Sequence, residues 1–366
     1  MPLKPLFRLF TLGAFTLFAS CATTTTAQSA KESSKPKNII LMIADGTGLS
    51  QISASQYFSS QPSNYDRFKH IGLIKTSSSS DLVTDSAAGA TAFSAGVKTY
   101  NGAIGVDKDT IPVPTILEQL EIKGYDTGII ATSTITHATP GSFYAHVKTR
   151  KMEEEIANNL VSSNIDFFAG GGVNFFTNRV DKRDVVMELR KKGYVIDTTR
   201  LNKTAKLDKN KRYGYLLSEG GMPSILDGRG SFLYDATKMG INRLSMNKKG
   251  FFLMVEGSQV DWGGHNNDAD YLISELIDFD TVIGQVLDFA GKDGNTLVIV
   301  TADHETGGFT LAADDGDYNK IKPTFSTGGH SATMVPVFAY GPGASEFSGV
   351  YENTEIYHKM RMLLNL

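Results

Sequence analysis

Three apolar runs, each followed by a carboxylate, place the strongest constraint on the fold of this chain. The runs with their acidic residues are 38–44 with Asp45, 251–255 with Glu256, and 296–300 with Asp303. A short apolar run without polar alternation is typical of a strand that is buried on both faces of a parallel sheet. Ligand sites in such sheets gather at the carboxyl ends of the strands. The sequence therefore predicts a parallel sheet with acidic side chains converging at one edge.

Helical patterns alternate with further strand patterns along the chain. Helices are expected at 114–123, 151–162, 184–192 and 268–290, and further strands at 71–74, 126–131, 165–169 and 335–340. Because parallel strands need crossover connections, this alternation predicts an α/β fold. We expect one large, mainly parallel central sheet with helices on both faces and small surface insertions, in a single catalytic domain over 37–366. The more charged stretch 173–250 is the least regular part.

The first residues read as an export signal rather than as part of the fold. Lys4 and Arg8 precede the apolar run 9–18, a pattern that is typical of a secretory signal peptide. The run is too short to span a bilayer as a helix. We therefore expect a signal peptide over 1–20 and an exported protein, either periplasmic or anchored at the outer membrane.

The only cysteine, Cys21, follows Phe-Ala-Ser in a pattern that resembles the lipobox of bacterial lipoproteins. This pattern predicts lipidation at Cys21, with residues 21–36 as a flexible tether rich in Thr, Ser and Lys. The alternative is ordinary cleavage after Ala27, which would release a soluble protein. With a single cysteine, no intramolecular disulfide can form.

The charge of the chain gives no global attraction to polyanions. The chain has 36 Lys and Arg against 39 Asp and Glu, and its formal net charge is -3. We therefore expect no nucleic-acid partner, and attraction for an anionic substrate has to come from a few local cations or from metal ions. The Lys-rich stretch 203–212 is interpreted as a solvated face.

Histidines stand near the same strand ends and complete candidate metal-ligand sets. Asp261 and His265 lie four residues apart, His304 adjoins Asp303, and His330 stands in a glycine-flanked loop. Converging carboxylates repel one another unless cations neutralise them. Carboxylate and imidazole together form a set of ligands that zinc accepts.

Ser86 is the candidate nucleophile. It follows Asp85 and opens a helical pattern of small residues. The positive end of a helix dipole favours an alkoxide only slightly, so a serine needs more help to attack at neutral pH. Direct contact with a dication supplies such help, as it does for metal-bound water.

Six segments, taken in order, resemble the bacterial alkaline phosphatases that use metal ions and a serine nucleophile. The segments are 44–48, 83–92, 138–150, 255–265, 301–304 and the region of His330. They cover nearly the whole chain after residue 37. The resemblance implies the same α/β fold, and hydrolysis of phosphate monoesters by two in-line displacements through a phosphoserine at Ser86.

The resemblance also implies a role for each matching residue. The ligands of a first zinc would be Asp261, His265 and His330, and those of a second zinc Asp45, Asp303 and His304. Asp45 would also bridge to a third site, usually magnesium, that Thr139 and Glu256 complete. Arg150, whose planar fork suits the task, would grip two phosphate oxygens, and Asp85 would orient it.

Two residues depart from the best-known bacterial pattern. His137 and Trp262 stand where that pattern has Asp and Lys. We expect both to neighbour the third site. An imidazole there would favour a softer ion than magnesium, so the identity of the third metal stays open.

Two alternatives compete with the monoesterase. A phosphodiesterase of the same superfamily generally lacks the third site and a residue like Arg150, and both match here. A non-catalytic metal- or phosphate-binding lipoprotein should have lost the nucleophile or a ligand, and none is missing. Small-molecule phosphate monoesters are therefore the expected substrates, and a homodimer is expected because relatives commonly form one.

Overall fold

The computed structural model describes residues 35–366. Cys21, the expected signal peptide and most of the expected tether lie outside the described residues. Within the described part of the chain, no helix combines the length and the apolar character needed to cross a membrane.

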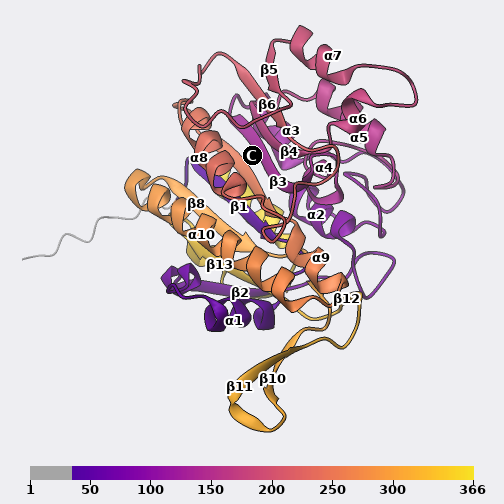
Figure 1. Ribbon diagram of the computed structural model, residues 1–366. Coiled ribbons are helices and arrows are strands. Elements are labelled where there is room, and N and C mark those ends of the chain that lie inside the picture. The colour runs from indigo at the N-terminus through magenta and orange to yellow at the C-terminus, as the bar shows by residue number, and fades with distance from the viewer. Residues whose placement is uncertain (1–34) are drawn as a thin grey trace, which may run out of the picture. The chain divides into compact units, whose positions relative to one another are not determined.

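A ten-stranded sheet forms the centre of the fold (Figure 1). In spatial order its strands are β14 (Gly349–Glu352), β2 (His70–Lys75), β13 (Val335–Tyr340), β8 (Thr296–Thr301), β1 (Asn38–Ala44), β7 (Phe251–Gly257), β3 (Asp126–Thr134), β4 (Phe167–Gly171), β6 (Arg212–Leu216) and β5 (Tyr194–Asp197). Neighbouring strands are parallel except at β13, which is antiparallel to both β2 and β8. The expected large, mainly parallel α/β sheet is confirmed.

The first predicted strand lies in the middle of this sheet. β1 is hydrogen-bonded to β7 on one side and to β8 on the other, and all of its residues are buried. Ile39, Leu41 and Ile43 join the hydrophobic core on one face, and the residues between them join the core on the other. This burial on both faces is the reason that the run shows no polar alternation.

Helices cover both faces of the sheet. One core includes residues of α2 (Ser86–Ala95), α3 (Ile116–Ile122), α5 (Glu153–Ser162), α7 (Val185–Lys191) and α11 (Glu355–Leu364). The other includes residues of α1 (Leu49–Phe58), α8 (Phe232–Leu244) and α10 (Ala269–Asp293). Figure 1 shows α8 and α10 lying across the sheet. The shorter helical elements are α4 (Ala138–Gly141), α6 (Asn174–Thr177), α9 (Gln259–His265), and the 3₁₀ turns η1 (Asn64–Arg67) and η2 (Ala344–Phe347).

Two small antiparallel strand pairs complete the fold. β9 (Glu305–Thr306) pairs with β12 (His330–Ser331), so that His330 lies opposite Thr306. β10 (Thr310–Asp314) pairs with β11 (Asp317–Thr324) in a hairpin that extends away from the sheet in Figure 1. These are the surface insertions that the strand–helix alternation did not locate.

Candidate active site

The carboxyl ends of β1, β7 and β8 bring the predicted acidic residues to one edge of the sheet. Ile43 pairs with Glu256 on one side and with Thr301 on the other, so Asp45 and Asp303 emerge beside Glu256. All three carboxylates are buried. Around them the side chains form three groups, named here the first, second and third clusters.

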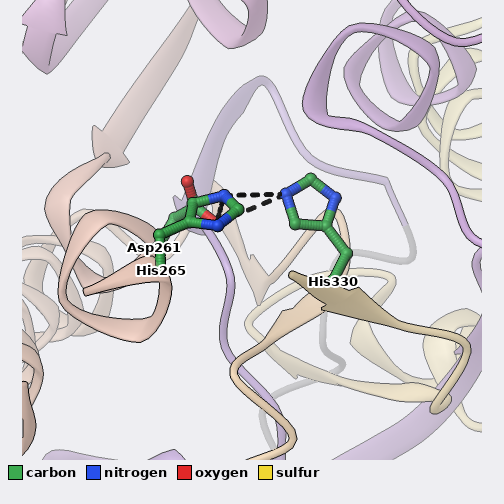
Figure 2. A group of neighbouring side chains, drawn as sticks. All are labelled: Asp261, His265 and His330. Atoms are coloured by element: carbon green, nitrogen blue, oxygen red, sulfur yellow. Dashed lines mark hydrogen bonds and ion pairs between the residues drawn. The ribbon is translucent and has the colours of Figure 1, made fainter. Parts of the chain in front are cut away.

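The first cluster consists of Asp261 and His265 from α9 and His330 from β12 (Figure 2). Asp261 Oδ1 lies 3.4 Å from His265 Nε2 and 3.6 Å from His330 Nε2. His265 Nδ1–H donates to Gly328 O (2.7 Å), and His330 Nδ1–H donates to Thr84 O (2.8 Å). In the neutral imidazoles both Nε2 atoms are then acceptors only, and they face each other at 3.2 Å. A cation held between them relieves this contact.

The second cluster consists of Asp45, Asp303 and His304, with Ser86 beside it. His304 Nε2 lies 3.5 Å from Asp45 Oδ1, 3.4 Å from Asp303 Oδ2 and 3.2 Å from Ser86 Oγ. Burial lowers the pKa of His304 to about 3, so its imidazole is neutral at any working pH. The neutral ring offers a ligand lone pair within reach of the serine hydroxyl.

The third cluster consists of Asp45, His137 and Glu256, whose ligand atoms lie within 4.8 Å of one another. Burial raises the pKa of Glu256 to about 7. Burial also raises the pKa of Asp45 well above its usual range, and the neighbouring charge of Asp303 adds to the effect. Without cations, these carboxylates therefore resist ionisation.

Buried atoms without hydrogen-bond partners lie at the same edge of the sheet. Among residues 35–366 they include both carboxylate oxygens of Asp45, Oε1 of Glu256, Oδ2 of Asp303, Oγ1 of Thr139 and Nδ1 of His137. Buried polar atoms are nearly always paired, and an unpaired one often has an ion as its partner. The imidazole–carboxylate sets of the first two clusters fit zinc, and the third cluster joins two carboxylates and the Thr139 hydroxyl to one imidazole, which leaves the identity of its ion open. The residues present thus fit three metal ions.

Asp85 and Arg150 form an ion pair at the start of α2. Asp85 is the N-cap of this helix, and its Oδ1 accepts the N–H groups of Ala88 and Gly102, both at 3.0 Å. Arg150 Nη1 donates to Asp85 Oδ2 (3.0 Å), and its Nη2 lies 3.1 Å from His137 Nε2. Burial opposes ionisation of Asp85, but these partners outweigh it and lower the pKa. The Arg150 side chain is 27% exposed, so it is open to an anion from solvent.

Sequence reasoning missed a buried carboxylate, Glu305, that connects elements behind the site. It accepts hydrogen bonds from Gln51 Nε2 in α1 (2.6 Å), from the N–H of Phe309 (3.0 Å) and from Ser331 Oγ. These bonds tie β9 to β12 next to His330. The only signal in the sequence was its place directly after the Asp-His pair.

Two further neighbours adjust the ligands. Thr306 Oγ1 donates to Asp261 Oδ1 (2.5 Å) and lies 3.2 Å from His304 Nδ1, so it links the first two clusters. The Trp262 ring stands edge-on to the His137 ring, with 6.2 Å between the centroids. Trp262 thus lies beside the third cluster.

The structure gathers at this edge all the residues to which the resemblance gave a site role. They are Asp45, Asp85, Ser86, His137, Thr139, Arg150, Glu256, Asp261, Trp262, His265, Asp303, His304 and His330. Their individual roles stay predictions. His146 is not one of these residues, and its two ring nitrogens are hydrogen-bonded to Glu118 Oε1 (2.9 Å) and Gly105 O (2.6 Å).

Comparison with known proteins assigns the family. The family model described as alkaline phosphatase matches residues 36–322 and 316–366. Alkaline phosphatase 3 of Bacillus subtilis is 35% identical, and the match covers 87% of this chain and 87% of that protein. The alkaline phosphatase of Escherichia coli is 31% identical, and the match covers 91% of this chain and 87% of that protein.

Solved structures agree with this assignment. The alkaline phosphatase of the Antarctic bacterium TAB5 is 57% identical, with a TM-score of 0.89, covering 91% of this chain and 98% of that one. A variant of the same enzyme, in which a histidine is replaced by aspartate, has magnesium bound in the site designated M3. Since the family model and full-length relatives both cover nearly all of the described chain, it belongs to the alkaline phosphatase family.

Proposed function

We propose that Ser86 is the nucleophile with which this phosphate monoester hydrolase forms a phosphoserine, and that Arg150 holds the phosphoryl group during the transfer. The proposal rests on the position of Ser86. It is the first residue of α2, and its Oγ lies 3.2 Å from Nε2 of His304. Family membership supplies the reaction, and this position supplies the reacting atom.

The cofactors are two zinc ions and a third ion, usually magnesium. We propose that the first and second clusters hold zinc and that the third cluster, completed by Thr139, holds the third ion. Bound there, the ions act as Lewis acids toward the phosphoryl oxygens and lower the pKa of a coordinated hydroxyl. In the TAB5 enzyme, magnesium occupies M3 in a variant with aspartate in place of histidine. By analogy, His137 is the residue that sets the preference of the third site here.

The residues of the chain account for both displacements. The Ser86 oxygen attacks phosphorus, the bond from phosphorus to the ester oxygen breaks, and the alcohol leaves with a proton. Water then attacks phosphorus, the bond to Ser86 breaks, and orthophosphate leaves. Throughout, Arg150 donates to two equatorial oxygens, where phosphoryl transfer needs positive charge. Asp85 holds the guanidinium through its 3.0 Å bond.

Substrate choice is tested by comparing p-nitrophenyl phosphate with bis-p-nitrophenyl phosphate. A monoester has two ionised oxygens for Arg150 and the metal clusters, whereas a diester places an alkyl or aryl group at one of these positions. We expect kcat/KM for the monoester to exceed that for the diester by at least about 10²-fold, the cost of a buried charge without its partner. A preference for the diester would instead identify a phosphodiesterase of the superfamily.

Replacing Trp262 by lysine should tighten inhibition by free phosphate. The side chain lies beside the third cluster, 6.2 Å from His137 between ring centroids, and follows the cluster residue Asp261. An ammonium there gains a charge-assisted hydrogen bond to phosphate, which corresponds to roughly a tenfold lower inhibition constant. The control is Trp262→Met, which removes the ring without adding charge. An inhibition constant that is equal in the two variants would contradict the idea.

We also propose that the protein is exported and anchored through a lipid at Cys21, on the support of its signal-like N-terminus. Mass spectrometry of the protein purified from membranes tests this, because an unmodified Cys21 would contradict the anchor. A homodimer remains a proposal based on resemblance to relatives, and light scattering of the purified enzyme measures it.

A further inference from the structure

The edge of the sheet opposite the active site carries a series of lysines. Nine of the ten strands run in one direction, so the loops before them lie at the edge away from Asp45. Seven of these nine strands have a lysine among the four residues that precede them. The lysines, before β1, β2, β3, β5, β6, β7 and β8, are Lys37, Lys69, Lys123, Lys192, Lys211, Lys249 and Lys292.

These loops form a continuous surface. The N–H of Lys37 donates to Asn295 O (2.8 Å), which connects the loops before β1 and β8. Gly250, before β7, packs so closely on Lys37 that an added Cβ would lie 2.2 Å from its carbonyl oxygen. Gly250 O in turn accepts the N–H of Asp126 at the start of β3 (3.3 Å). Four of the lysine-bearing loops are therefore in direct contact.

Arg243 connects this surface to the loop before β6. Its Nη1 donates to Asp126 Oδ2 (2.6 Å), and its Nε donates to Lys211 O (2.9 Å). A cavity of about 320 Å³ opens here, and most of its charged lining is basic. The charged residues lining it are Lys192, Lys209, Lys211, Arg212, Arg243 and Asp166. Residues 209–212 of the stretch 203–212, interpreted from sequence as a solvated face, thus line this basic cavity.

The outward charge of this surface is positive. We name it the lysine edge, which consists of Lys37, Lys123, Lys192, Lys209, Lys211, Lys248, Lys249 and Lys292, all exposed. Within residues 35–366, none of these lysines forms an ion pair with a carboxylate. Three nearby acids have partners within the fold instead: Asp126 and Asp166 pair with Arg243, and Asp293 accepts from Asn38 and Thr296. Asp208 is exposed beside Lys209, and its Oδ1 accepts the N–H of Asn210. A chain of net charge -3 therefore has a locally cationic face.

We propose that the lysine edge rests on a membrane surface of anionic lipid headgroups, with the active site at the edge that faces away. Exposed lysines spread over several loops suit a diffuse layer of headgroups. Each lysine near the surface adds about fivefold to membrane partitioning. The chain before Lys37 enters the fold at this same edge, so a lipid at Cys21 would bring this edge toward the bilayer. The charge argument itself needs no lipid.

The test is vesicle co-sedimentation of the full chain carrying Cys21→Ser, so that no acyl chain contributes. We expect it to bind vesicles of one part phosphatidylglycerol to two parts phosphatidylcholine, and not vesicles of phosphatidylcholine alone. Binding should disappear at 1 M salt, where the Debye length is about 3 Å. The triple variant Lys123→Glu, Lys209→Glu, Lys248→Glu should partition at least about tenfold more weakly.

The matched control changes the same net charge elsewhere on the surface. It is the triple variant Lys182→Glu, Lys238→Glu, Lys320→Glu. The three lysines are also exposed, and they lie in the loop after α6, in α8 and in β11, respectively. We expect this control to lose much less membrane binding, and both variants to keep wild-type turnover of p-nitrophenyl phosphate, which shows that they fold. Equal losses in the two variants, absence of binding to the anionic vesicles, or binding to duplex DNA in preference to vesicles would each overturn the proposal.

Discussion

Replacing Ser86 by alanine is expected to lower kcat for p-nitrophenyl phosphate by at least about 10³-fold. The hydroxyl forms the covalent bond to phosphorus, and removing a nucleophile costs a large part of the rate enhancement of an enzyme that acts through a covalent intermediate. The buried carboxylates and imidazoles remain, so the variant should still bind zinc. Steady-state kinetics and metal analysis of the purified variant measure both effects.

Ser94→Ala is the matched control for this experiment. Ser94 lies in the same helix, and its hydroxyl donates to the backbone oxygens of Ser142 (2.6 Å) and Thr91 rather than to a cluster residue. Its loss should lower stability modestly and leave turnover largely intact. If Ser86→Ala kept turnover near the wild-type value with its metals bound, the phosphoserine route would be wrong.

Removing the metals is expected to lower the melting temperature most strongly at alkaline pH. Folding raises the pKa values of Asp45, Asp303 and Glu256, the last to about 7. Between pH 6.5 and 8.5 the metal-free fold thus binds more protons than the unfolded chain, and its stability falls as pH rises. Glu256 alone contributes about 1 kcal/mol over this window, and the raised pKa values of Asp45 and Asp303 act in the same direction.

Two histidines oppose this trend at lower pH. Burial lowers the pKa values of His304 and His137 to about 3, so the unfolded chain takes up protons below about 6.5 while the fold does not. Below about pH 6.5 the histidine and carboxylate contributions therefore oppose each other, and the fall in stability with rising pH should be clearest above that value. With metals bound, the carboxylates are ionised and paired, and the decline toward pH 8.5 should disappear.

Calorimetry of chelated and zinc-restored protein at several pH values checks this prediction. Restoring the metals in the same sample controls for irreversible damage by the chelator. A metal-free melting temperature that stays level or rises from pH 6.5 to 8.5 would show that the three carboxylates do not share one buried site.

The sequence predicted the central strands because burial on both faces leaves a clear pattern. The run 38–44 became β1 without change, and the helix expected at 268–290 became α10 (Ala269–Asp293). The hairpin β10–β11 was not predicted, because most of its residues are exposed and no apolar periodicity marks it. The two-residue strands β9 and β12 are too short to have any periodicity.

The site was predictable where chemistry follows a strand end and not where it depends on distant contacts. Asp45 stands next to its strand in sequence, and topology alone places it at the carboxyl edge. Glu305 works through Gln51, which is 254 residues away in the chain. No local pattern marks such a bond, since it exists only after α1 and β9 have packed against each other.

Asp45 belongs to both the second and the third cluster, and this shared membership makes the two sites interdependent. An ion that occupies one site fixes the carboxylate and removes the proton that its raised pKa would otherwise retain. The neighbouring site then receives a ligand that is already oriented and charged. We therefore expect the two sites to be coupled, so that an ion in one site favours binding of an ion in the other.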